Sequence, residues 1–107
     1  SSRKMNSEVL ILYSRKGCCL CQTLEEKLSN ICLEKLNPSI VLSIVDIDNK
    51  KVSIDIKMKY TNEVPVMVLD SSRLLNKFEL PRISPRLKED MLLSWIQKNL
   101  NILYKKA

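Results

Sequence analysis

The apolar residues of this chain fall into short runs and into stripes with helical spacing, and these patterns predict its elements. Residues 9–13 form a continuous apolar run of strand length, which is typical of a buried strand. After a polar break at residues 14–17, apolar positions recur every three or four residues. This spacing predicts an amphipathic helix from Leu20 to near Asn37-Pro38. Its predicted buried face consists of Leu20, Leu24, Leu28, Ile31 and Cys32.

The middle of the chain alternates between strand and helix patterns. Residues 40–45 are apolar and rich in β-branched side chains, so they predict a second strand. Asp46 and Asp48 close it, and either aspartate is suited to cap the next element. Residues 52–60 are ambiguous, because apolar side chains alternate there as in a strand. Their place between two predicted sheet strands favours a short helix, and we predict one.

Two more strands and a helix complete the pattern. Residues 64–69 predict a third strand with proline near its start, where proline is tolerated. The turn residues 70–72 and a fourth strand at 73–80 make this region a hairpin. Ser84 and Pro85 suit a helix N-cap and the first helical position. The apolar stripe of that helix consists of Leu87, Met91, Leu92, Trp95, Ile96, Leu100 and Leu103.

The predicted order is therefore β-α-β-α-β-β-α. It corresponds to an α/β fold in which helices pack on the faces of a mixed four-stranded sheet. The length of 107 residues suits one domain. We assign residues 8–104 to this domain and expect the polar residues 1–7 to be frayed.

Composition removes several classes of function. The single glycine, Gly17, excludes glycine-rich phosphate loops, and the absence of histidine excludes histidine bases and histidine-containing metal sites. The net charge of +6 is spread along the chain without a nucleic-acid-binding motif, so we expect a solvated basic surface and no nucleic-acid partner. No apolar run is long enough for a membrane helix. With no evident signal peptide, we expect the protein in the cytoplasm or an equivalent reducing compartment, such as a plastid or organelle stroma. We also expect it to be a monomer.

The chemistry-bearing feature is a cysteine cluster between the first strand and the first helix. Cys18 and Cys21 form a C-x-x-C pair, which near a βαβ pattern indicates a redox motif. At a helix start these two thiols lie close enough to bridge, and the exposed amides favour a thiolate. Thiols in such places have pKa values of about 3.5–7.5. Arg15 and Lys16 add positive charge, and Gly17 permits a tight turn beside the approaching partner.

Each cysteine receives a predicted role. Cys18 is the nucleophile because it lies nearer the free helix end, and Cys21 is the resolving thiol inside the helix. Cys19 is either a loop residue without a role or an auxiliary thiol, and Cys32 belongs to the core. Three clustered cysteines without histidine make a poor zinc site, so we expect no metal. An iron–sulfur cluster bridged between two subunits stays an alternative.

The cluster lies in a longer segment that resembles a known family. Residues 13–21 (Tyr-Ser-Arg-Lys-Gly-Cys-Cys-Leu-Cys) are similar to the glutaredoxin-like branch of the thioredoxin fold, in which a strand ending in Tyr-Ser runs into Gly-Cys-x-Leu-Cys. Residues 45–48 resemble its second strand, and Tyr60 with residues 64–66 resembles its cis-proline segment. The resemblance spans about residues 9–100. It implies a thioredoxin fold and a cis bond before Pro65. It also implies that this loop faces the cysteines and that the Val64 backbone pairs with a bound peptide or glutathione.

The sequence also departs from that family. Typical glutaredoxins carry Pro-Tyr between their cysteines, where this chain has Cys19 and Leu20. They also have a Gly-Gly-x-Asp stretch that holds the glutathione carboxylate, and no such stretch follows Phe78. Arg15 falls where many of them place a lysine that assists glutathione binding. Leu12 stands where thioredoxins keep a buried acid.

These observations predict a glutaredoxin-like thiol–disulfide oxidoreductase, active in electron transfer and cell redox homeostasis. Its partners are protein disulfides, glutathione or both, with glutathione as a co-substrate and no bound cofactor. The predicted substrate-binding residues are Arg15, Lys16, Gly17, Val64 and Pro65, beside the catalytic pair Cys18 and Cys21. The alternatives are a catalytically weak thioredoxin-fold module for binding or redox sensing, and binding of nucleic acid or another anionic surface through the basic charge.

Overall fold

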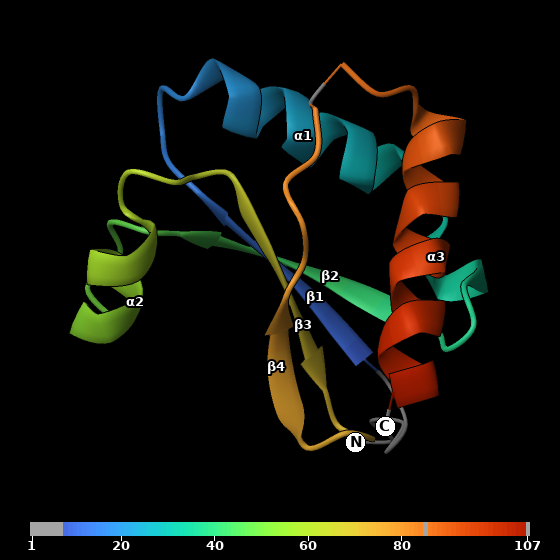
Figure 1. Ribbon diagram of the computed structural model, residues 1–107. Helices are drawn as coiled ribbons and strands as arrows, with labels where there is room; N and C mark the ends of the chain where they lie inside the picture. Colours follow the sequence, from blue (N-terminus) through green and yellow to red (C-terminus); the bar gives the residue numbers. More distant parts are fainter. Residues whose placement is uncertain (1–7, 85, 107) are drawn as a thin grey trace, which may run out of the picture.

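The computed structural model describes residues 8–84 and 86–106 (Figure 1), so the predicted frayed segment 1–7 lies outside the described residues. The predicted order β-α-β-α-β-β-α is confirmed, with one added 3₁₀ turn. The strands are β1 (Glu8–Ser14), β2 (Ile40–Asp46), β3 (Val66–Ser71) and β4 (Asn76–Glu79). The helices are α1 (Cys19–Asn30), α2 (Ile54–Tyr60) and α3 (Glu89–Lys106), and the 3₁₀ turn is η1 (Leu33–Lys35).

The four strands form one mixed sheet in the order β2-β1-β3-β4. Strand β1 runs parallel to β2 and antiparallel to β3, and β3 runs antiparallel to β4. The register pairs Tyr13 of β1 with Val45 of β2 on one side and with Val66 of β3 on the other. The end of β1 that leads into the cysteine cluster is therefore held between two neighbouring strands.

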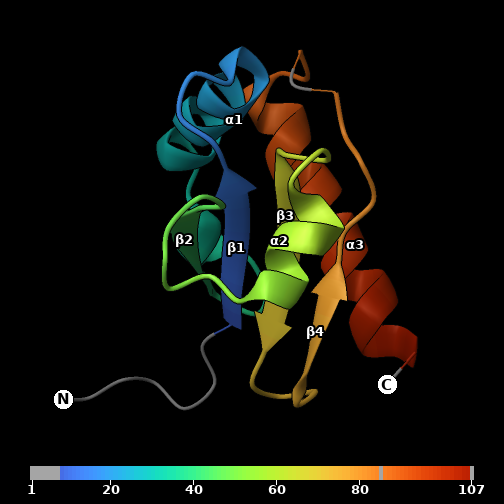
Figure 2. The same cartoon turned by 90° about the vertical axis from the view of Figure 1, so that its left-hand side faces the viewer.

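Helices cover both faces of the sheet, as predicted. Helices α1 and α3 lie on one face, where leucine and isoleucine side chains from both helices and the central strands form the larger core (Figures 1 and 2). Helix α2 lies on the other face, and its Tyr60 packs with Tyr13, Ile47 and Val66 in a second core. The rings of Tyr13 and Tyr60 stack with centroids 5.5 Å apart. Among the described helices, none has the length and apolar character required to cross a membrane.

Helix α1 is shorter than its periodicity predicts. It ends at Asn30, because the backbone of Ile31 becomes extended (φ −97°, ψ 156°). Beyond this point the helical spacing no longer determines which residue faces the core. Cys32 is exposed, so its predicted core position is wrong, whereas Leu33 and Leu36 are buried through η1.

Helix α2 confirms that residues in the ambiguous stretch 52–60 form a helix. Its N-cap is Ser53, whose hydroxyl accepts a hydrogen bond from the Ile56 amide (3.2 Å). The prediction that Asp46 or Asp48 caps the next element is therefore wrong. Asp46 ends β2 instead, and its carboxylate accepts the Asp48 amide (2.9 Å).

The β3–β4 hairpin is shifted from its predicted turn. Strand β3 continues through Ser71, residues 72–75 form the turn, and β4 is only four residues long. The Ser71 hydroxyl accepts the Leu74 amide (2.9 Å), and Leu75 takes the left-handed region with φ 54°. A side-chain hydrogen bond therefore moves the turn past the predicted residues 70–72.

Helix α3 begins at Glu89, later than predicted. The Ser84 carbonyl accepts the Leu87 amide (3.1 Å), which makes a turn before the helix instead of its N-terminus. Pro85, predicted as the first helical residue, lies outside the described residues. The buried residues of the helix are Leu92, Ile96 and Leu100. Met91 is 54% exposed, so its predicted place in the buried stripe is wrong.

A buried acid that the sequence did not reveal joins both ends of the described chain. Glu8 is 0% exposed and accepts hydrogen bonds from the Ser72 hydroxyl, the Arg73 amide and the Tyr104 hydroxyl. Burial by itself would raise the pKa of Glu8, but these bonds and one from Ser71 hold the pKa below its ordinary value. Strand β1, the hairpin turn and α3 therefore meet on one carboxylate.

Candidate redox site

The site is built on the redox loop (residues 15–18), which joins β1 to α1. The Cys18 amide donates to the Arg15 carbonyl (3.2 Å), closing a tight turn. Gly17 occupies the left-handed region with φ 80°, which glycine adopts without the penalty that a Cβ brings. The turn therefore delivers Cys18 to the N-cap of α1, as the sequence predicted.

The conformation of Gly17 gives a testable stability effect. Gly17→Ala should lower the free energy of unfolding by about 1 kcal/mol, because an L-residue is strained at positive φ. Apart from Gly17 and its two chain neighbours, no atom of the described residues lies within 4 Å of the added Cβ, so backbone strain is the only expected cost. Urea unfolding of the oxidised protein measures the change, with exposed Ser29→Ala in α1 as the control. A Gly17→Ala variant as stable as the control would contradict the assignment of strain.

Cys18 and Cys21 are joined as a disulfide across the first turn of α1. Their Cα atoms are 5.2 Å apart, and the Cys21 amide also donates to Cys18 Sγ (3.2 Å). Cys21 is 0% exposed, whereas Cys18 is only partly buried. The sulfur at the helix end is therefore the one that an external partner reaches first.

The surroundings of Cys18 favour a negative sulfur. The first turn of α1 contains no acidic residue, so its amides and the helix dipole act on Cys18 without a neighbouring carboxylate in that turn. Lys16 is exposed in the redox loop. These are the conditions under which helix N-termini lower thiol pKa values.

The remaining cysteines are free thiols. Cys19 is the first residue of α1 and is exposed, and Cys32 is exposed at the start of η1. In the described ranges 8–84 and 86–106, no three histidine, cysteine or acidic side chains are grouped as metal ligands would be.

A second segment, the proline loop (residues 61–65), connects α2 to β3. The Val64–Pro65 bond is cis, as the resemblance implied. The Val64 amide donates to the Tyr60 carbonyl (3.2 Å). A substrate backbone that pairs with this amide must therefore replace an existing hydrogen bond.

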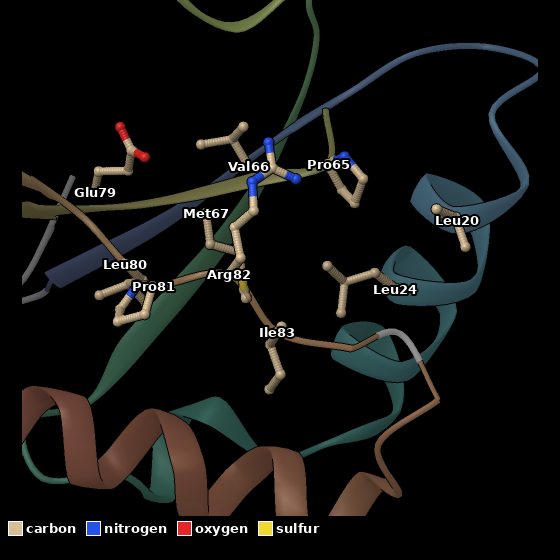
Figure 3. Close-up of a pocket in the computed structure, with 10 residues that line it drawn as sticks. All are labelled: Leu20, Leu24, Pro65, Val66, Met67, Glu79, Leu80, Pro81, Arg82 and Ile83. Atoms are coloured by element: carbon tan, nitrogen blue, oxygen red, sulfur yellow. The ribbon is translucent and has the colours of Figure 1, made fainter. Parts of the chain in front are cut away.

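A small apolar groove lies between the first turns of α1 and the proline loop. It encloses about 80 Å³, with Leu20 and Leu24 on one side and Pro65, Met67 and Arg82 on the other (Figure 3). Leu20 is 58% exposed, so its predicted burial in the core is wrong. The groove is therefore lined by the residue that directly precedes Cys21 in the first turn of α1.

Arg15 has more partners than the sequence indicated. Its guanidinium binds the carboxylate of Asp48 and the carbonyl and hydroxyl of Thr61. The hydrogen bond to Asp48 raises the pKa of Arg15 and lowers the pKa of Asp48. Sequence reasoning missed both partners, because they lie 33 and 46 residues away and no local pattern relates them to Arg15.

Comparison with known protein families gives a match that includes this site. The sequence matches the family described as "Glutaredoxin-like domain (DUF836)" over residues 9–97. Searches of the curated proteins and of the solved structures found no match. The matched range contains both cysteines of the disulfide, the redox loop and the proline loop.

Proposed function

Because the chain belongs to the glutaredoxin-like domain family, we propose that it is a thiol–disulfide oxidoreductase whose redox pair is Cys18 and Cys21. One observation carries the proposal. The two sulfurs are bonded at the N-terminus of α1, with the outer one at the cap and the inner one fully buried. The family and the bonded pair together support a redox role for this site.

The proposed reaction balances as two exchanges. In the reduced protein, the Cys18 thiolate attacks one sulfur of a substrate disulfide and forms a mixed disulfide, while the other substrate sulfur leaves as a thiolate. Cys21 then loses its proton and attacks the Cys18 sulfur, which releases the second substrate thiolate. The substrate gains two electrons, and the protein becomes the Cys18–Cys21 disulfide. A thiol reductant must return those two electrons before another cycle.

We propose protein disulfides, glutathione or both as partners, with no resident cofactor. The basic charge of +6 supports steering of acidic partners. A reducing compartment such as the cytoplasm or an organelle stroma would supply the thiol reductant, and a monomer would suffice for the chemistry. Lys16 and the groove beside Leu20 supply the charge and the apolar contacts for a bound partner.

A thiol titration tests this proposal. In the fully reduced protein, one thiol should ionise with a pKa of about 3.5–7.5, because the helix amides stabilise its thiolate. Thiolate absorbance in the ultraviolet follows the ionisation in wild type, Cys18→Ser and Cys21→Ser. The low-pKa ionisation should disappear in Cys18→Ser and persist in Cys21→Ser. An unchanged titration in Cys18→Ser would reject Cys18 as the nucleophile.

The Val64 amide already donates a hydrogen bond to the Tyr60 carbonyl. This internal bond favours a second candidate function, a catalytically weak module for binding or redox sensing. Such a module would form the disulfide and yet turn over slowly, because substrate pairing competes with an internal hydrogen bond. Reduction of a model disulfide coupled to a glutathione or thioredoxin system separates the two functions. Sustained turnover supports the oxidoreductase, and a single stoichiometric exchange supports the module.

A further inference from the structure

We propose that Arg15 is a positioning residue that ties the redox loop to the proline loop, instead of a group that binds the charge of the substrate. The inference rests on the proposed function, because it concerns how a disulfide partner docks beside Cys18. Arg15 is the cation of the redox loop whose side chain already forms hydrogen bonds to other segments of the protein.

The guanidinium of Arg15 makes four hydrogen bonds to two other segments. Nε and Nη2 donate to the two carboxylate oxygens of Asp48 (2.9 and 3.1 Å). Nη1 donates to the Thr61 carbonyl (2.9 Å), and Nη2 also donates to the Thr61 hydroxyl (2.6 Å). The planar fork of arginine permits this bidentate arrangement, which a lysine cannot reproduce.

These bonds join the parts of the site on which docking depends. Asp48 follows β2, and Thr61 is the C-cap of α2 and the first residue of the proline loop. The Arg15 carbonyl meanwhile accepts the Cys18 amide (3.2 Å). One residue therefore links the turn that presents Cys18 to the segment that leads to Pro65.

The same contacts argue against a direct role in binding an anionic substrate. Asp48 already neutralises the guanidinium at bonding distance, and a substrate carboxylate would have to displace Asp48 or Thr61. Lys16, the next residue, is exposed, and none of the ion pairs found among the described residues includes it. Lys16 is therefore the better placed cation for attracting a substrate charge.

The proline loop is also held from its other side. Nη2 of Arg82, in the chain after β4, donates to the carbonyl of Glu63 and to its carboxylate. Glu63 lies two residues before Pro65, so Arg15 and Arg82 hold the loop at its first and its middle residue. The Arg82–Glu63 pair is well exposed, with side chains 59% and 58% accessible, whereas the Arg15 side chain is only 34% accessible. Arg15 is thus the less exposed of the two anchors.

The test compares two disulfide substrates of equal reactivity, one neutral and one carrying carboxylates. Arg15→Met should lower kcat/KM about tenfold for both substrates, since misplacing a docking segment costs rate whatever the substrate charge. Arg15→Lys should fail to restore the rate, because it keeps the charge and loses the fork. Lys16→Met should instead show a direct charge effect, with a larger loss of kcat/KM for the anionic substrate than for the neutral one. Lys105→Met, exposed in the last turn of α3, controls for the loss of one positive charge.

A second readout separates positioning from an effect on the sulfur itself. Alkylation of Cys18 by iodoacetamide needs a thiolate and no docked partner, so its rate should change less than twofold in Arg15→Met. A loss confined to the anionic substrate, rescue by Arg15→Lys, or a parallel fall in alkylation would overturn the proposal. An inactive wild-type protein would instead reject the proposed function, so the two failures are distinguishable.

Discussion

Replacing Cys18 with serine should abolish disulfide exchange, lowering the rate by about 10³-fold or more, because no other sulfur occupies the N-cap of α1. Initial rates of reduction of a small-molecule disulfide, with a coupled thiol reductant, measure the loss. The partly buried sulfur at the helix end is the one that an external disulfide reaches, whereas Cys21 is 0% exposed. The loss should therefore be a loss of chemistry and should leave the fold unchanged.

The Cys21→Ser variant gives the matched contrast. Its Cys18 thiolate can still attack, but the variant lacks the resolving thiol of Cys21, so the mixed disulfide should accumulate and be visible by mass spectrometry. Cys32→Ser, at an exposed position 11 residues beyond Cys21, should exchange at the wild-type rate. Cys19→Ser decides whether the neighbouring exposed thiol assists. Wild-type turnover in Cys18→Ser, or a trapped adduct on any cysteine other than Cys18 in Cys21→Ser, would contradict the assigned roles.

The largest stability effect should come from the buried acid. Glu8→Ala should lower the free energy of unfolding by about 3 kcal/mol, because it removes the acceptor from several donors at once. Those donors include the Ser72 hydroxyl, the Arg73 amide and the Tyr104 hydroxyl, with a further hydrogen bond from Ser71. Urea unfolding measures the change, with exposed Glu34→Ala in η1 as the control, expected within about 0.5 kcal/mol of wild type. A Glu8→Ala variant no less stable than the control would refute the proposed role of this carboxylate.

Glu8 and its hydrogen-bond donor Tyr104 also predict how the stability of the protein depends on pH. The pKa of Glu8 is lowered in the folded protein, so its contribution is fully present above the ordinary value of 4.5 and is lost as the pH falls through the lower folded pKa. The pKa of Tyr104 is raised from 10.0 to about 12, chiefly by burial and then by its bond to Glu8. Its contribution is therefore present below pH 10.0 and is lost as the pH rises towards about 12. Glu8→Gln should reduce both the loss of stability at low pH and the loss at high pH, as measured by unfolding curves across this pH range.

Local patterns in the sequence determined most of the fold. The continuous apolar run of β1 indicates a strand covered on both faces, and the stripe of α3 indicates a helix buried on one face. Both patterns are encoded by residues close together in the chain. The C-x-x-C spacing likewise depends only on residues that are close together in the chain. Because three residues make nearly one helical turn, the sequence alone placed Cys18 and Cys21 within reach of each other.

Only the tertiary structure decided features that depend on distant partners. The end of α1 at Asn30 exposed Cys32, and the groove beside the proline loop left Leu20 accessible, although helical spacing assigned both to the core. Arg15 found its partners 33 and 46 residues away, and Glu8 found Tyr104 at a separation of 96. Side-chain periodicity specifies which face of an element is buried but not which residue of another element lies opposite it. Those contacts were therefore determined only when strands, loops and helices packed together.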